Sequence, residues 1–203
     1  MAIKPRRNPE SEYKSFTFVV VEGDGIAERG YLTVAGKYLP AKSKGRLKRP
    51  RKTKHSSIQA MLKHASKLGN RRGDEVWLML DVDDHNVPDK NGKRALDLVE
   101  EWRNKGGGHR VALSTPRFEH WLLLHFQEYQ PRPDDNDLER LLKKWLPQYS
   151  GHGTPEAIYE KGIALGHIQE AMKRGRKLGL PCMPTHPRFE SVGHLLSSLD
   201  FPE

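Results

Sequence analysis

The segment Ser114-Thr-Pro-Arg-Phe-Glu-His-Trp-Leu-Leu-Leu-His-Phe126 joins the end of an apolar strand to the start of an amphipathic helix. It places one acid, Glu119, between Phe118 and Trp121. An ionised carboxylate beside so much apolar surface is costly unless it has a partner. Two other apolar runs also end in acids, at Val21-Glu22-Gly23 and at Leu80-Asp81-Val82-Asp83. The three clusters predict one acidic, metal-binding crevice at the carboxyl ends of three strands.

Outward from this segment, apolar runs predict strands at Ser15–Glu22, Glu75–Asp81 and Arg110–Ser114. Apolar periodicity predicts helices at Ile26 to about Val34, Ser56 or Ser57 to about Leu68, Arg94 to about Lys105, and Phe118–Gln127. Further helices are expected at Asp134–Trp145, at Thr154 to about Leu178, and near Phe189–Leu199. Strands that alternate with helices favour an α/β fold with a mostly parallel sheet flanked by helices. Ligands of such sheets bind beyond the carboxyl ends of the strands.

The composition changes along the chain indicate three parts. Residues 1–14 are expected to form a basic flexible arm, and residues 15–130 a metal-binding α/β core that carries a basic insertion at 37–54. Residues 131–203 are expected to form a helical C-terminal part packed on that core. A length of 203 residues fits one α/β domain with a small appendage.

Bulk features exclude several protein classes. No run approaches the roughly 20 apolar residues of a membrane span, and the basic N-terminus lacks the apolar stretch of a signal peptide. The single cysteine, Cys182, excludes an intramolecular disulfide and a cysteine zinc site. We therefore expect a cytoplasmic protein that does not contact a membrane.

The formal net charge of +9 comes from one segment. Nine Lys and Arg residues and no acid lie between Lys37 and Lys54. Subtracting them from the 35 basic residues leaves 26, which equals the 26 acidic residues of the chain. Such a segment is typical of a phosphate-backbone contact, with a solvated surface loop as the alternative. The residues expected to bind nucleic acid are Lys42, Lys44, Arg46, Lys48, Arg49, Arg51, Lys52 and Lys54.

The acids themselves suggest hard-metal chemistry. Asp81 and Asp83 point to the same side of an extended segment, where they repel each other unless a cation lies between them. Carboxylate oxygens are the ligands that Mg²⁺ and Mn²⁺ prefer. Glu22 is a metal ligand, a general acid or base beside a scissile phosphate, or only a turn carboxylate that caps the next helix. Two such metals activate water and stabilise the leaving oxygen of a phosphodiester.

Several of these motifs together resemble the RloB-like family. They are Val-Val-Val-Glu-Gly with Glu28 and Tyr31-Leu, Leu-Asp-Val-Asp-Asp, the Ser114–Phe126 segment, Tyr159-Glu-Lys161 and Pro-Thr-His-Pro, over residue 16 to the end of the chain. The family looks like a branch of the Toprim fold of topoisomerases, primases and OLD nucleases. The resemblance implies that Glu22, Asp81 and Asp83 hold metal, and it matches Glu119 and Lys161 to two further family positions. The family's usual Glu-Gly-x-x-Thr-Glu is here Glu22-Gly-Asp-Gly-Ile-Ala-Glu28, one residue longer, so the match is closer at Glu22 than at Glu28.

These features lead to a functional expectation. The chain is expected to be a Toprim-type Mg²⁺- or Mn²⁺-dependent nuclease that hydrolyses DNA or RNA, tRNA included, as the effector of an anti-phage defence system. The expected catalytic residues are Glu22, Asp81, Asp83, Glu119 and Lys161, with Lys161 neutralising developing phosphate charge. The alternative is a non-catalytic nucleic-acid-binding regulatory subunit of an ATPase-containing defence complex. An ATPase partner is implied by the resemblance alone.

Overall fold

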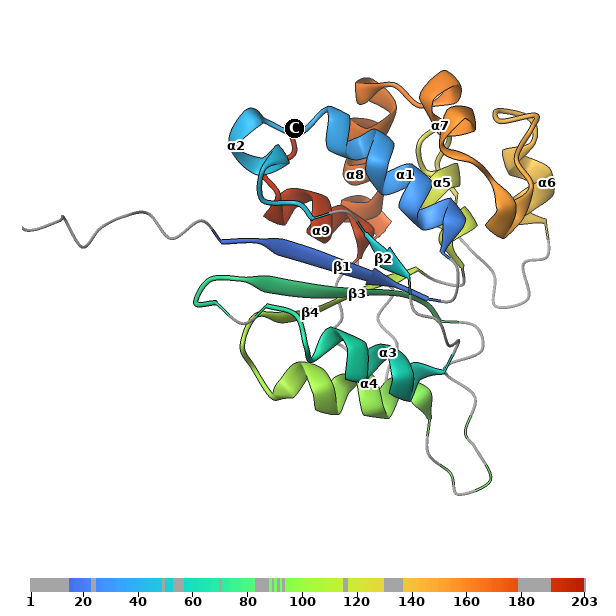
Figure 1. The fold of residues 1–203 in the computed structure, drawn as a ribbon. Helices are drawn as coiled ribbons and strands as arrows, with labels where there is room; N and C mark the ends of the chain where they lie inside the picture. Colours follow the sequence, from blue (N-terminus) through green and yellow to red (C-terminus); the bar gives the residue numbers. More distant parts are fainter. Residues whose placement is uncertain are drawn as a thin grey trace, which may run out of the picture.

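A computed structural model gives the fold of the chain (Figure 1). It describes residues 15–22, 25–48, 50–52, 57–69, 71–82, 88, 90, 92, 94–114, 117–129, 137–178 and 191–202. Over these residues the strands form one all-parallel sheet in the order β2-β1-β3-β4. The strands are β1 (Thr17–Val21), β2 (Arg51–Lys52), β3 (Glu75–Asp81) and β4 (His109–Ser114). The predicted α/β class is confirmed.

Helices cover both faces of this sheet (Figure 1). One face carries α3 (Ile58–Ala65) and α4 (Ala95–Asn104). The other carries α1 (Ile26–Lys37), α5 (Phe118–Leu123), α6 (Leu138–Leu142), α7 (Glu156–Gly162), α8 (Leu165–Leu178) and α9 (Val192–Ser198). Two short helices, α2 (Ala41–Lys44) and the 3₁₀ turn Gly151–Gly153, complete the described elements. Because both faces are covered, the central strands are continuous apolar runs rather than alternating ones.

The apolar core is divided by the sheet into two clusters. Val19 and Val21 of β1 belong to the cluster under α1, and Val20 belongs to the cluster under α3 and α4. This alternation follows from the period of two along a strand. Apolar residues of α6 to α9 share the first cluster with β1 and α1, so the C-terminal helices bury their side chains against the same core.

The helix predicted from Thr154 to about Leu178 is wrong in one respect, because the structure contains two helices there. α7 ends at Gly162, Ile163 adopts an extended conformation, and α8 begins at Leu165. Glycine is a poor helix former. A Cβ atom at Gly162 would also lie 2.1 Å from a methyl carbon of Leu146, so the close approach of two segments requires glycine here. The break turns the buried Ile163 side chain into the core.

The observed bounds of other helices differ from the predicted ones by a few residues. α1 continues three residues beyond Val34, and α3 begins after Ser57, whose hydroxyl accepts a hydrogen bond from the Ala60 amide at 3.4 Å. α5 ends at Leu123 rather than Gln127. The predicted arm at 1–14 and Cys182 lie outside the described residues.

The basic insertion expected at 37–54 contains the short helix α2 and the edge strand β2. The Thr17 amide donates to the Arg46 carbonyl and the Lys48 amide donates to the Thr17 carbonyl, both at 2.9 Å. Arg51 then pairs with Val20 as β2 joins the sheet edge. The segment is thus fixed against β1 by backbone hydrogen bonds.

Within the described part of the chain, no helix combines the length and the apolar character that a membrane crossing requires.

Candidate functional site

The carboxyl edge of the sheet brings the predicted strand-end acids onto neighbouring strands. Glu22 directly follows β1, and Asp81 is the last residue of β3. β1 and β3 are hydrogen-bonded neighbours with Val21 opposite Met79, and Asp81 lies opposite Ser114 of β4. Glu22 and Asp81 therefore lie at the same edge of the sheet, as the sequence predicted. Asp83, the third predicted ligand, lies outside the described residues.

The pleat of β3 sets the face on which Asp81 lies. Leu80 and Val82 belong to the cluster under α3 and α4, whereas Met79 belongs to the cluster under α1. Because side chains alternate along a strand, Asp81 lies on the α1 side of the sheet. That side also holds the buried acids described next.

Two helices begin at this edge, and each carries an acid in its first turn. α1 starts after Gly25, whose φ of +47° is in the left-handed region. A Cβ atom at Gly25 would lie 2.2 Å from a methyl carbon of Val21, so only glycine permits this sharp return over the end of β1. Glu28 in α1 and Glu119 in α5 are 8% and 6% exposed. Two carboxylates are thus buried in the first turns of helices that begin at the carboxyl edge.

Glu119 has one partner and one orphaned oxygen. Its Oε1 accepts a hydrogen bond of 2.8 Å from the Tyr149 hydroxyl, and both side chains are buried. Its Oε2 is buried without a hydrogen-bond partner in the described part of the structure. A buried acceptor without a partner is costly, so this oxygen is a place where a cation or a donor from a ligand would be stabilised.

Two tyrosines line the same buried cluster. Burial, and after it the negative charge of Glu119, raises the pKa of Tyr149 well above its usual range. Burial and then the charge of Glu28 raise the pKa of Tyr159 in the same direction. Each tyrosine is influenced by both carboxylates, which means that Glu28, Glu119, Tyr149 and Tyr159 form one electrostatic unit. Both hydroxyls therefore stay protonated, and that of Tyr149 donates its proton to Glu119.

Sequence reasoning missed part of this unit. Glu28 was seen as a less certain family match, and Tyr159 only as part of a motif with Lys161. Tyr149 gave no signal, because it follows α6 in an ordinary polar stretch and reaches Glu119 only through the tertiary fold. The one signal available in the sequence was the position of Glu28, an acid near the start of a helix that follows a glycine-rich stretch.

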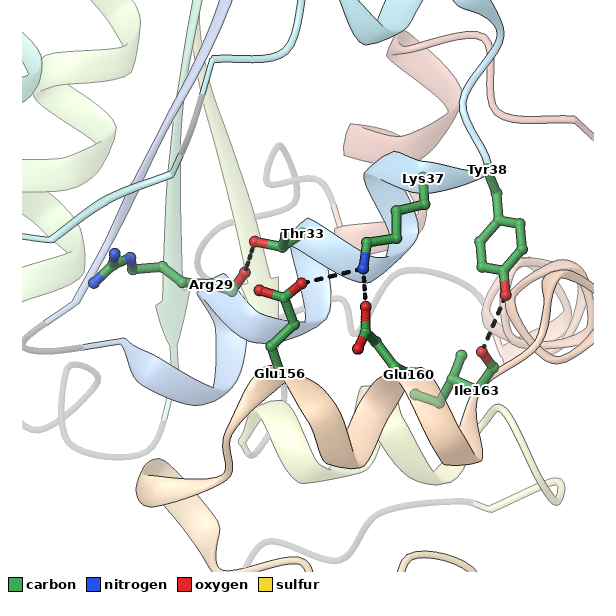
Figure 2. Close-up of polar contacts among 7 residues, drawn as sticks. All are labelled: Arg29, Thr33, Lys37, Tyr38, Glu156, Glu160 and Ile163. Carbon is green, nitrogen blue, oxygen red and sulfur yellow. Dashed lines mark hydrogen bonds and ion pairs between the residues drawn. The ribbon is translucent and has the colours of Figure 1, made fainter.

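Contacts between α1 and α7 fix the position of Tyr159. Figure 2 shows the Lys37 ammonium between the carboxylates of Glu156, at 3.3 Å, and Glu160. The Tyr38 hydroxyl donates to the Ile163 carbonyl at 3.4 Å just beyond the end of α7. Both contacts are partly exposed and individually weak, but they hold α7 against α1.

Arg29 is a basic residue near the carboxyl edge, in the first turn of α1. In Figure 2 its side chain extends away from Glu156 and Glu160. Its Nε is buried without a hydrogen-bond partner among the described residues. The residue follows Glu28 in the first turn of α1, so its guanidinium belongs to the end of the helix that lies at the carboxyl edge. A guanidinium there suits an anionic ligand, because it offers several donors in a fixed geometry.

Lys161 lies on another surface. It follows Tyr159 by two residues in α7, and residues two apart on a helix point in nearly opposite directions. Tyr159 is buried, whereas Lys161 is exposed and lines a surface pocket beside Trp145. The structure therefore does not bring Lys161 to the Glu28 and Glu119 carboxylates.

One acid, Asp200, pairs with two of the predicted nucleic-acid-binding residues. The Lys42 ammonium lies 3.3 Å and an Arg46 guanidinium nitrogen 3.9 Å from Asp200, and the Ser43 hydroxyl donates to the same carboxylate at 3.0 Å. The Lys48 ammonium lies 3.7 Å above the centre of the Phe16 ring. Lys44 and Arg51 are described, the side chain of Lys52 is not, and Arg49 and Lys54 lie outside the described residues.

The donor set at the edge fits a hard cation. Glu22, Asp81, Glu28 and Glu119 offer only oxygen ligands, which suits Mg²⁺ or Mn²⁺ rather than a softer metal. Within the described residues, no group of three or more acids, histidines or cysteines is close enough to hold a metal unaided. The orphaned Oε2 of Glu119 is the observation that points to a missing positively charged partner.

Comparison with known proteins assigns the family. The model of the family described as RloB-like protein matches residues 17–191, which spans all four strands and both acid-bearing helices. The chain belongs to the RloB-like protein family. The resemblance inferred from the sequence motifs is thereby confirmed. No curated protein and no solved structure matches the chain.

Proposed function

We propose that this protein is a nuclease that depends on Mg²⁺ or Mn²⁺ and hydrolyses phosphodiester bonds in DNA or RNA, tRNA included. The observation that carries the proposal is the placement of Glu22 and Asp81 at the carboxyl edge of a parallel sheet, where the helices that carry the buried Glu28 and Glu119 also begin. Ligands bind at this edge of parallel sheets, and a nearby cation would stabilise the buried Oε2 of Glu119, which has no hydrogen-bond partner among the described residues.

The metal would be held by Glu22 and Asp81, with Asp83 as the third ligand expected from its spacing. When bound, it supplies positive charge that polarises the phosphate and lowers the pKa of a water molecule. Glu119 orients the site through its free oxygen, and Tyr149 holds the other oxygen in place at 2.8 Å. Glu22 acts as general acid or base at the scissile phosphate.

Basic residues position the nucleic acid in this proposal. The Arg29 guanidinium contacts a phosphate at the edge, and the segment fixed against β1 contacts the backbone farther away. Lys161 faces a different surface, so the proposal does not give it contact with the scissile phosphate. The role as effector of an anti-phage system, the relation to Toprim enzymes and the association with an ATPase are proposed from the family resemblance.

The test is metal-dependent cleavage by the wild-type protein and an Asp81→Ala variant, with plasmid DNA, single-stranded DNA and total tRNA as substrates. Mg²⁺, Mn²⁺ and EDTA form the three arms. Glu101→Ala is a matched control, because Glu101 is an exposed acid on α4, on the opposite face of the sheet. The expected result is cutting that needs metal, that is lost in Asp81→Ala and that persists in Glu101→Ala.

The alternative function, a non-catalytic nucleic-acid-binding regulatory subunit, gives a different pattern. It requires binding that weakens with salt and no metal-dependent turnover of any substrate, with or without an ATPase partner.

A further inference from the structure

Trp145 is the one tryptophan of the chain that the fold leaves exposed. The other three, Trp77, Trp102 and Trp121, are 1%, 2% and 5% exposed, whereas Trp145 is 48% exposed. A large aromatic side chain contributes most when it is buried against a partner. An indole kept at the surface is therefore a candidate contact for a ligand.

The indole of Trp145 is held in a fixed orientation. Its ring is stacked on that of Phe126, with centroids 5.4 Å apart and planes within 5°. Its amide donates to the Leu142 carbonyl at 2.9 Å, and the next residue, Leu146, is buried in the core. Because the ring is already ordered, a ligand that binds it loses little additional conformational entropy at this residue.

A pocket of about 260 Å³ adjoins the indole. The residues that line it include the aromatic Trp145, the amide-bearing Gln148, the apolar Ile158 and the basic Lys161. The pocket joins the segment after α6 to the last turn of α7, where Gly162 allows the close approach to Leu146. An aromatic face, an amide that donates and accepts, and a cation are the three groups that recognise a nucleobase and its phosphate.

The charge around the pocket favours a polyanion. Lys144 and Lys161 are exposed, and neither has an acidic partner in the described part of the chain. The nearby Lys143, by contrast, pairs with Glu139 at 2.7 Å. The acids closest in sequence to Lys161 on α7, Glu156 and Glu160, are both held by Lys37. The exposed cations therefore face solvent beside the indole.

We propose that this pocket binds one unpaired nucleobase of a single-stranded nucleic acid, with the base stacked on Trp145, its edge on Gln148 and its phosphate on Lys161. The proposal rests on the proposed function and narrows its substrate class to strands with unpaired bases. A base inside a duplex has both faces covered by its neighbours, so a duplex cannot make this stack.

Because Trp145 is exposed and the other three tryptophans are buried, stacking of a base on Trp145 can be followed by fluorescence without a cleavage assay. Quenching by acrylamide or iodide acts mainly on Trp145, since the other three tryptophans are buried. The experiment titrates the full chain with a ten-nucleotide oligothymidylate or oligouridylate in EDTA, follows tryptophan emission, and repeats the titration with a duplex of the same length. The expected result is a change in emission on adding single strands and protection of the quenchable fraction.

Three variants sharpen the test. Trp145→Ala should weaken single-strand affinity about 5- to 150-fold, because stacking one base is worth about 1–3 kcal/mol. Trp145→Phe should retain part of the affinity, since a smaller ring still stacks. Lys161→Gln should weaken binding and reduce the slope of log K against log salt by about 0.7. Lys105, an exposed lysine at the end of α4, provides the matched control. Lys105→Gln removes the same charge outside the pocket, so it should change the affinity and the salt slope less than Lys161→Gln does.

The outcomes separate this proposal from the nuclease proposal. Asp81→Ala should bind single strands in EDTA as the wild type does, so loss of cleavage with an intact Trp145 response leaves the pocket proposal standing. Equal affinity of wild type and a folded Trp145→Ala variant, or emission that responds to duplex and single strand alike, would overturn it. Emission that responds to no nucleic acid would also overturn it and would assign the pocket to another class of partner.

Discussion

Replacing Tyr149 by Phe removes one hydroxyl from the buried cluster and leaves the ring in place. The hydroxyl donates the 2.8 Å hydrogen bond to Glu119 Oε1. The other oxygen of Glu119 already lacks a hydrogen-bond partner among the described residues, so the variant leaves the whole carboxylate without one from that part of the chain. A hydrogen bond to a charged group contributes about 1.5–3 kcal/mol, and an orphaned buried acceptor adds to its loss. We expect the free energy of unfolding to fall by about 2–3 kcal/mol.

The magnitude can be checked by urea and thermal unfolding followed by circular dichroism. For a chain of this length, 1 kcal/mol corresponds to about 2–4 °C, so the midpoint should fall by roughly 4–12 °C. Tyr38→Phe is the matched control, because the Tyr38 hydroxyl makes only a 3.4 Å contact with the Ile163 carbonyl. That variant should lose less than about 0.5 kcal/mol.

A double-mutant cycle identifies the partner. In a Glu119→Gln background the acceptor is neutral, and a neutral hydrogen bond contributes only about 0.5–1.5 kcal/mol. Tyr149→Phe should therefore cost clearly less there than in the wild type, with a coupling energy of about 1 kcal/mol. An equal loss of stability in both backgrounds would refute the reasoning that the charge of Glu119 is what Tyr149 stabilises.

Three further predictions concern other parts of the fold. Burial lowers the pKa of His125 from 6.5 to about 3, so the unfolded chain binds a proton at this residue more readily than the folded chain does. The free energy of unfolding is therefore unaffected by this residue above pH 6.5, and it falls by about 1.4 kcal/mol per pH unit as the pH drops from 6.5 toward 3. Urea unfolding at pH 7.5 and 5.0 should show a loss of about 2 kcal/mol in the wild type that His125→Asn lacks, and the same pH dependence in both would contradict this. Gly162→Ala should destabilise by about 1–3 kcal/mol because its Cβ meets Leu146, whereas Gly166→Ala, with open space around it, should be neutral or stabilising in the same thermal melts. Asp200→Asn frees the cations that this acid pairs with, so the slope of log K against log salt for oligonucleotide binding should steepen by about 1–2, and an unchanged slope would show that those cations do not reach the nucleic acid.

The parts of the fold that depend on local pattern were predictable. The strand Glu75–Asp81 was predicted with its observed bounds, because an apolar run of five residues with an acid at each end is a strong local signal. Glu22 and Asp81 were placed on one edge because parallel strands align their carboxyl ends. Pattern and topology together were enough for this half of the candidate site.

The features that depend on contacts between distant segments were not predictable. Tyr149 is 30 residues from Glu119, and no periodicity relates the two. Leu146, which a Cβ atom at Gly162 would meet, lies in an earlier segment, so the pattern of residues from Thr154 to Leu178 alone does not reveal the break at Gly162. Asp200 neutralises part of the basic segment from the far end of the chain. A count of charges along the sequence cannot reveal such pairing.

The central claim is that the acids at the carboxyl edge form a metal-dependent phosphodiesterase site. The most direct test compares cleavage of plasmid DNA, single-stranded DNA and tRNA by the wild-type protein and by the Asp81→Ala variant. Cutting that requires Mg²⁺ or Mn²⁺, stops in EDTA and is lost in a folded Asp81→Ala variant is the predicted result. Full cleavage by that variant would contradict the site, and binding without any metal-dependent cleavage, even with an ATPase partner added, would contradict the nuclease.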